Sequence, residues 1–340
     1  MPDEISVWEK DPALVNRFTT VPKPDVTTPP LAFNFFPATS PLSNDRTTAE
    51  FRYWTAAATL RRAADFWADS SQRPTQWRHG QVLDVYVDRG DGLNSEYNGQ
   101  SLNFYHGSPD GHPTIVVYSG ESPDLLCHEL GHAVLDAVCP GCTNRNLLET
   151  DAFIESFGDM SAILCALQIP TYRSAILEEI KGRNFWSSSS LSRVAEQFGA
   201  AVRLENPNEA DDDCLRNAWN EHFYVDPEGL NPIGPPDTIA ANAHSFSRVF
   251  TGALFEVLAG MLSVIAHGND PKPEHLQQAS AHMRDILMDG AKKASVAVVP
   301  RFYASVGEAI VEASGRYDQA YPELFQSVFV RRNILPAAIA

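Results

Sequence analysis

Residues 124–138 read DLLCHELGHAVLDAV, and they decide the fold because apolar residues at helical spacing surround two histidines four positions apart. Residues four apart lie on one face of an α-helix, about one turn from each other. His128 and His132 can therefore share one metal ion. The sequence predicts a helix over residues 122–138 that presents this pair of imidazoles.

A third ligand for such an ion is predicted on the next helix, over residues 150–168. A catalytic zinc ion has three protein ligands and one open position. Glu155 lies 155 − 132 = 23 residues after His132, and Asp159 follows on the same helical face, suited to accept the free ring N–H of a ligating histidine. Glu129, next to the first ligand, is placed to act on water instead of the metal. The alternative is that Glu155 and Asp159 are simply exposed on a solvated face of the helix and bind no metal.

These two motifs, HELGH and ESFGD, resemble the thermolysin-like zinc metallopeptidases, or gluzincins, whose signature is HExxH followed by Glu-x-x-x-Asp. The resemblance runs from about residue 48 to the end. It implies an α+β fold with an antiparallel-sheet N-terminal half, a mostly helical C-terminal half and the active-site cleft between them. It also implies one catalytic Zn²⁺, a peptide or protein substrate, and an endopeptidase activity.

Substrate-binding residues are expected from the same resemblance. SLNFYHGSPDG, residues 101–111, resembles the edge strand that pairs with substrate, which gives Asn103 a side-chain contact and Phe104 a main-chain contact. CLRNA resembles the segment whose arginine binds a peptide carbonyl, here Arg216. Leu215 and Leu125 would then favour an apolar residue after the cut. Without the resemblance, Asn103 would be interpreted as a turn residue, and Arg216 as an ordinary charged residue exposed to solvent.

The segment AHSFSRVF resembles the one that carries the family's transition-state histidine, so His244 is expected to stabilise the oxyanion. Without the resemblance, His244 would be an ordinary residue at a helix N-terminus. The tyrosine that the family places shortly before its third ligand is missing, because no Tyr occurs between Ala133 and Thr171. A zinc-bound module that is catalytically weak or inactive is therefore the rival hypothesis. The intact Glu129 favours the enzyme.

The rest of the chain is predicted in three parts: an extended arm over residues 1–45, an α+β half over 46–140 and a mainly helical half over 141–340. Thr47 and Glu50 form a capping-box pattern at the start of a helix. Short β-prone runs at residues 82–87, around 101–106 and at 114–119 predict an antiparallel sheet. Further helices are predicted near 244–267, 274–297, 301–315 and 318–331.

Charge and hydropathy restrict the partners. The formal charge of −17 repels phosphate backbones, so nucleic-acid binding is disfavoured. We find no apolar run of the roughly 18 residues that a bilayer requires, so no membrane association is expected. Asp124 stands where family members can bind calcium, but partner carboxylates are not recognisable. It is interpreted as favouring the helix dipole, and structural Ca²⁺ is not expected.

The five cysteines form an odd, scattered set, which favours a reducing compartment such as the cytoplasm. The N-terminal sequence lacks a signal-peptide pattern, although an exported protein with a preceding leader stays open. The CPGC motif at residues 139–142 is interpreted as structural or incidental, against half a zinc ribbon or a redox pair.

Overall fold

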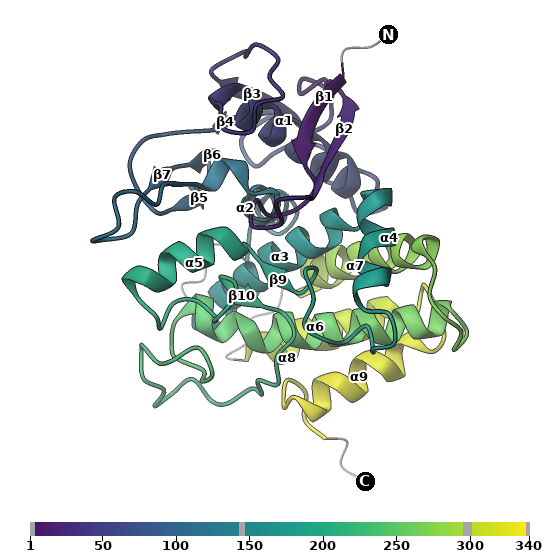
Figure 1. The fold of residues 1–340 in the computed structure, drawn as a ribbon. Coiled ribbons are helices and arrows are strands. Elements are labelled where there is room, and N and C mark those ends of the chain that lie inside the picture. The colour runs from purple at the N-terminus through teal and green to yellow at the C-terminus, as the bar shows by residue number, and fades with distance from the viewer. Residues whose placement is uncertain (1–3, 143–146, 295–300, 338–340) are drawn as a thin grey trace.

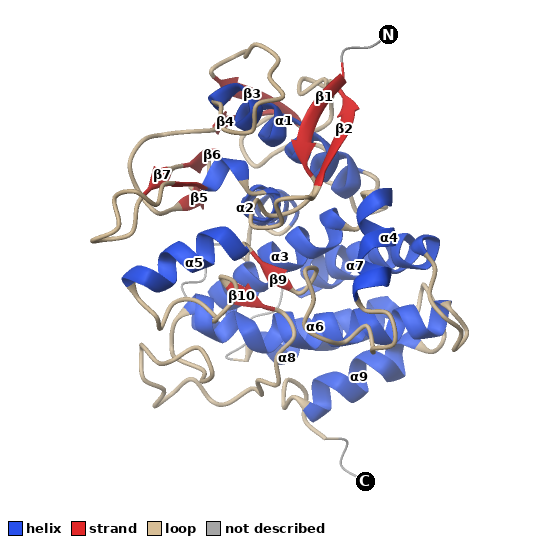
Figure 2. Cartoon of the chain, viewed as in Figure 1, coloured by secondary structure: helices blue, strands red, loops and turns tan. Residues whose placement is uncertain are grey.

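A computed structural model describes residues 4–142, 147–294 and 301–337 of the chain. Helices and small sheets are mixed along the sequence, so the fold class is α+β, as predicted (Figure 2). Strands lie mainly in the N-terminal part, and helices make up most of the C-terminal part.

The N-terminal 45 residues are more regular than the extended arm that we predicted. Strands β1 (Glu4–Trp8) and β2 (Phe18–Pro22) form an antiparallel hairpin. Strand β3 (Ala32–Phe36) joins the main sheet and buries Phe33 and Phe35 in the core. Thr19, Thr20 and Pro22 lie within β2 itself, and the alternation of phenylalanines is the signal that reveals β3.

The main sheet has the order β3-β4-β6-β5, with β4 at Val82–Tyr86, β5 at Ser95–Tyr97 and β6 at Ser101–Phe104. Strand β4 is parallel to both β3 and β6, and only β5 pairs antiparallel, so the predicted antiparallel sheet is wrong. Helix α1 (Ala49–Ala68) is the reason, because it carries the chain from β3 back to the start of β4, and such crossovers connect parallel strands. Strands β7 (His106–Gly107) and β8 (Val117–Tyr118) form a separate antiparallel pair.

Helix α1 packs against the two helices that carry the histidines and the downstream carboxylates. Its N-cap is Thr48, which accepts a hydrogen bond from the Phe51 amide, so the cap lies one residue after the predicted Thr47. Near its end, the Trp67 indole donates to the Ser161 hydroxyl, which donates to the Cys127 carbonyl. These two bonds join three helices in the core.

The helical part surrounds the predicted motifs (Figure 1). Its elements are the 3₁₀ turn η1 Ser119–Glu121, α2 Pro123–Val138, α3 Leu148–Ala166, α4 Pro170–Glu179, β9 Arg193–Val194, α5 Glu196–Glu205, β10 Arg216–Asn217, α6 Ala243–Ile265, α7 Pro273–Ala294, α8 Phe302–Ser314 and α9 Tyr321–Arg331. The helices predicted around α2, α3, α6, α8 and α9 are confirmed to within a few residues. The predicted end of α7 at 297 lies outside the described residues. Helices α4 and α5 were not predicted.

Helix α6 corrects the expectation about apolar runs. It is long and apolar enough to cross a membrane, with a mean hydropathy of 1.6 over its most apolar 18-residue window. That window is 67% buried inside the protein. The helix contacts α3, α7 and α9, as expected of a central core helix.

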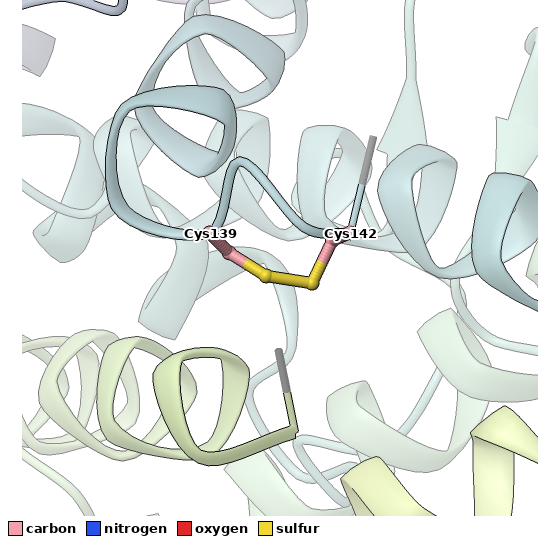
Figure 3. The surroundings of a disulfide bond; sticks show 2 residues. All are labelled: Cys139 and Cys142. Atoms are coloured by element: carbon pink, nitrogen blue, oxygen red, sulfur yellow. A yellow bond between two sulfur atoms is a disulfide. The ribbon is translucent and has the colours of Figure 1, made fainter. Parts of the chain in front are cut away.

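The CPGC motif forms a disulfide between Cys139 and Cys142 at the C-terminal end of α2 (Figure 3). Both residues are buried. Because their sulfur atoms are bonded to each other, they are not available as metal ligands in this state. Cys127, Cys165 and Cys214 are free and buried. The disulfide disfavours half a zinc ribbon, and it is common to a structural pair and a redox pair.

Candidate metal centre

Helices α2 and α3 approach so closely that glycine is required at both sides of the contact. A Cβ atom on Gly131 would lie 2.7 Å from the Ser161 Cβ atom, and one on Gly158 would lie 2.7 Å from Cε1 and Nδ1 of His128. The His128 ring thus rests directly on the backbone of α3. This packing brings Glu155, one turn earlier on α3, to the histidine pair.

The distances around Glu155 fit a shared metal ion. Its Oε2 lies 3.4 Å from His128 Nε2, and its Oε1 lies 3.6 Å from His132 Nε2. Tetrahedral ligands at zinc bond lengths of about 2.0–2.1 Å are separated by about 3.3–3.4 Å. Good hydrogen bonds between such atoms are shorter, about 2.7–3.2 Å. The spacing therefore suits three ligands around a cation better than direct hydrogen bonding.

Two carboxylates compete for the role of third ligand. Among the described residues, His128, Glu129 and His132 bring potential ligand atoms within 4.8 Å of one another. Glu129, however, is already engaged by β5, because the Ser95 hydroxyl donates to its Oε1 at 2.7 Å and the Tyr97 amide donates to its Oε2 at 2.8 Å. Glu155 Oε2 is buried and has no hydrogen-bond partner in the described part of the chain. Glu155 is therefore the better candidate ligand, and Glu129 is held beside the position that an ion would take.

Asp159 orients the first histidine. Its Oδ1 lies 3.1 Å from His128 Nδ1, on the side of the ring away from Glu155. Arg216 fixes this carboxylate in turn, with Nε at 3.0 Å from Oδ2 and Nη2 at 2.8 Å from Oδ1. His132 has no such support, since its Nδ1 is buried without a hydrogen-bond partner among the described residues. The two histidines are thus held by different means.

The electrostatics favour a cation at this position. Burial disfavours a charged imidazole, yet the neighbouring carboxylates of Asp159 and Glu155 raise the pKa of His128 to about 10. Burial likewise opposes ionisation of Glu155, but the charges of His244, His128 and His132 hold the pKa of its carboxyl well below the usual range. A metal ion would take the place of the protons that this cluster attracts.

His244 joins the same group from a distant part of the chain. It lies in the first turn of α6, which Asn242 caps by accepting a hydrogen bond from the Ser245 amide. Its Nε2 is 3.4 Å from Glu155 Oε2, while the side chain remains 69% exposed. The histidine therefore stands at the mouth of the site, with one ring nitrogen directed toward the metal position.

A cavity of about 500 Å³ opens over these groups. Six of the residues predicted from the sequence line it: Leu125, His128, Glu129, Leu215, Arg216 and His244. The structure adds Phe198 and Val202 from α5 to its apolar wall, and Ser95 from β5. Sequence reasoning missed these three because their segments carried no recognised motif. The apolar spacing of Phe198 and Val202, four residues apart, was the available signal.

Asn103 and Phe104 do not reach the cavity. Their strand, β6, pairs with β4 on one side and β5 on the other, so the prediction that it is an edge strand is wrong. Both side chains are fully buried, and Asn103 Oδ1 accepts a hydrogen bond from the Ser101 hydroxyl. The edge strand beside the site is β5. Asn103 is a buried polar residue satisfied within its own strand.

Asp124 also has a different role from the one expected. Its Oδ1 pairs with the Lys10 ammonium at 2.5 Å, and both side chains are buried. Its Oδ2 accepts a hydrogen bond from the Ala195 amide at 2.9 Å. The residue does lie in the first turn of α2, but an ion pair with the N-terminal segment, and not only the helix dipole, stabilises its charge.

No family model matches this chain, and no curated protein matches it either.

Proposed function

We propose that this protein is a zinc-dependent endopeptidase of the thermolysin-like kind. His128, His132 and Glu155 would hold the ion, and Glu129 would act on the attacking water. The observation that carries the proposal is the buried Oε2 of Glu155, which has no hydrogen-bond partner among the described residues and lies 3.4 Å from His128 Nε2, while Oε1 lies 3.6 Å from His132 Nε2. The Arg216 guanidinium, with Nη2 at 3.6 Å from Oε2, approaches this oxygen without forming a hydrogen bond. Such a carboxylate is costly to bury unless a cation satisfies it.

Zinc, when bound, supplies a Lewis acid that polarises a carbonyl and lowers the pKa of water. Glu129 then accepts the proton of the attacking water and delivers it to the leaving amine. The hydrogen bonds from Ser95 and the Tyr97 amide orient this carboxylate, so it need not reorganise as the reaction begins. The base is thus fixed to the sheet while the ligands are fixed to the helices.

Stabilisation of the developing oxyanion falls to His244 in this proposal. The exposed ring lies at the mouth of the cavity, where a carbonyl oxygen of the substrate would enter. Arg216 is largely committed to Asp159, so its main action is to hold His128 through that carboxylate. The tyrosine expected from the resemblance is missing from the sequence, so His244 would supply a larger part of the oxyanion stabilisation.

Substrate recognition would use β5 and the apolar wall. Strand β5 lies at the edge of the main sheet, and an extended peptide can add to such an edge through main-chain hydrogen bonds. Leu125, Phe198, Val202 and Leu215 line the cavity nearby. These side chains favour an apolar residue after the cut.

The test combines metal content with peptide cleavage. Parent protein should bind about one equivalent of zinc and cleave a mixed-sequence peptide library, with cleavage abolished by a chelator and restored by zinc. Glu129→Gln should keep the zinc and lose at least about 100-fold in kcat/KM. Glu205→Gln is the matched control, because that exposed residue ends α5 and lies outside the site.

Three outcomes would contradict the proposal. Retention of zinc by both proteins without cleavage of any peptide would favour a binding module. If the parent protein binds no zinc, the proposed metal site is refuted. Equal activity in Glu129→Gln and the parent would assign the proton transfer elsewhere.

A further inference from the structure

Arg248 is a buried charged residue in the wall of the cavity over the metal position. It lies on α6, four residues after His244, so the two side chains leave the same face of the helix about one turn apart. The Arg248 side chain is only 7% exposed. A guanidinium stays charged at any ordinary pH, so its role in the protein depends on the groups that it contacts.

One nitrogen of Arg248 contacts two different loops. Its Nη1 donates to Asp211 Oδ1 at 2.6 Å and to the Pro236 carbonyl at 2.7 Å. Asp211 belongs to the loop between α5 and β10, whereas Pro236 belongs to the loop between β10 and α6. Hydrogen bonds from a charged donor are about twice as strong as those between neutral groups. Arg248 therefore attaches both loops to helix α6.

Asp211 extends this link to the segment that carries Leu215 and Arg216. Its Oδ2 accepts a hydrogen bond from the Asn217 amide at 2.6 Å. Arg216 and Asn217 form β10, and Arg216 in turn binds the Asp159 carboxylate. The Asp211 carboxylate thus uses one oxygen for the guanidinium and the other for the backbone of β10.

The loop that contains Pro236 forms a wall of the cavity. Residues 232–236 all line it, and Ile233 is 65% exposed. The base of the loop is closed by the Ala241 amide, which donates to the Asn231 carbonyl at 2.7 Å. The contact of Arg248 with the Pro236 carbonyl attaches the middle of the same loop. Loops of binding sites open readily, so such an anchor determines how firmly the wall is held.

We propose that Arg248 is a positioning residue for substrate binding, which holds the cavity wall by joining α6 to the Asp211 carboxylate and the Pro236 carbonyl. This inference rests on the proposed peptidase function, because it assigns the wall to the bound peptide. In the described part of the chain, the contacts of Arg248 go to these loops and not to Glu129 or the candidate zinc ligands. Loss of Arg248 therefore weakens substrate binding and leaves the chemical step intact.

Steady-state cleavage of one peptide by the zinc-loaded protein tests the proposal. Arg248→Met keeps an unbranched apolar stem and removes the donor. It should raise KM about 10-fold, while kcat stays within about 2-fold and zinc content matches the parent. A merely structural role would lower zinc content and kcat together, through loss of folded protein, and leave KM unchanged. Arg316→Met, which removes an exposed arginine paired with Asp289, is the control and should behave like the parent.

Two further variants separate the contacts of Arg248 from its bulk. Lysine replaces arginine poorly where two nitrogens bind, but here one nitrogen makes both contacts, so Arg248→Lys should recover KM to within about 3-fold of the parent. Asp211→Asn should raise KM several-fold. The double variant with Arg248→Met should be no worse than Arg248→Met alone, because the two residues act through one contact. If Arg248→Met does not fold, Asp211→Asn takes its place.

Amide hydrogen exchange gives a readout besides cleavage. The Asn217 and Ala241 amides should exchange faster in Arg248→Met than in the parent and in Arg316→Met. Unchanged exchange, or a parent-like KM in both Arg248→Met and Asp211→Asn, would overturn the inference and leave the proposed function standing. A parent protein that binds zinc but cleaves no peptide would overturn the proposed function and this inference together.

Discussion

Replacing Lys10 with methionine should destabilise the protein strongly, although the residue lies far from the metal centre in sequence. The Lys10 ammonium is 0% exposed, and its partner Asp124 is 1% exposed, at 2.5 Å. Removing the ammonium leaves a buried carboxylate without its counterion, which costs about 3–5 kcal/mol. The lost hydrogen bond from Lys10 Nζ to the Arg193 carbonyl adds about 1 kcal/mol.

Urea unfolding at fixed zinc concentration measures this change. For a protein with a free energy of unfolding of about 5–15 kcal/mol, Lys10→Met should lower the transition midpoint markedly. Lys181→Met is the control, because Lys181 pairs with Glu178 on the exposed surface and should change stability by at most about 1 kcal/mol. Lys10→Met combined with Asp124→Asn should recover part of the loss. A cost below about 1 kcal/mol for Lys10→Met would refute the buried ion pair.

Three further variants test the site and its surroundings. Gly158→Ala should displace the His128 ring and reduce zinc affinity about 10–100-fold in chelator competition. Gly307→Ala is the control, because its added Cβ would meet its neighbours at 3.4 Å and should leave zinc affinity unchanged. Equal zinc affinities in the two variants would contradict the close packing of Gly158 on His128. Leu215→Ala should lower kcat/KM for peptides with leucine after the cut about 10-fold, and an unchanged preference would exclude Leu215 from the pocket. Burial and two neighbouring arginines lower the pKa of His222 to about 4, below its unfolded value of about 6.5. The folded state then binds fewer protons, so stability should fall by up to about 3 kcal/mol as pH drops from about 6.5 to 4. His222→Gln should flatten that slope in pH-dependent unfolding, and identical slopes would contradict the shift.

The candidate metal ligands could be predicted because the pattern that reveals them is local. His128 and His132 share one helical turn, and Glu155 and Asp159 repeat the same spacing on the next helix. To predict that α2 and α3 pack together, it was enough that the segment between them is short and that each helix has an apolar face. Gly158 was also visible within ESFGD, but its reason, contact with the His128 ring, appears only in three dimensions.

The sheet could not be predicted in the same way, because strand order depends on contacts between distant segments. Strand β5 (Ser95–Tyr97) lies outside the predicted β-prone runs, because its three residues are too few to show a pattern. Alternation within the remaining runs does not tell an edge strand from a central one. Assigning β6 to the edge placed Asn103 in the cleft. In the structure β5 has that position, and the Tyr97 amide contacts the proposed base.

The N-terminal segment is the hardest case, because WEKD at residues 8–11 has the composition of a solvated surface loop. Lys10 and Asp11 are nevertheless completely buried. Charged residues are seldom buried unless they are paired, and the partners here lie more than 100 residues away in the sequence. No local pattern could reveal them.

The contacts of this buried segment also connect the two halves of the proposed site. Lys10 holds Asp124 in the first turn of α2, one turn before His128. Asp11 accepts hydrogen bonds from the Ser122 hydroxyl, just before α2, and from the Gln197 amide in α5. Helix α5 contributes to the apolar wall of the cavity through Phe198, the next residue after Gln197, and through Val202. Because one pair of side chains supports both the ligand helix and the pocket wall, a change in the N-terminal segment should alter zinc binding and substrate preference together.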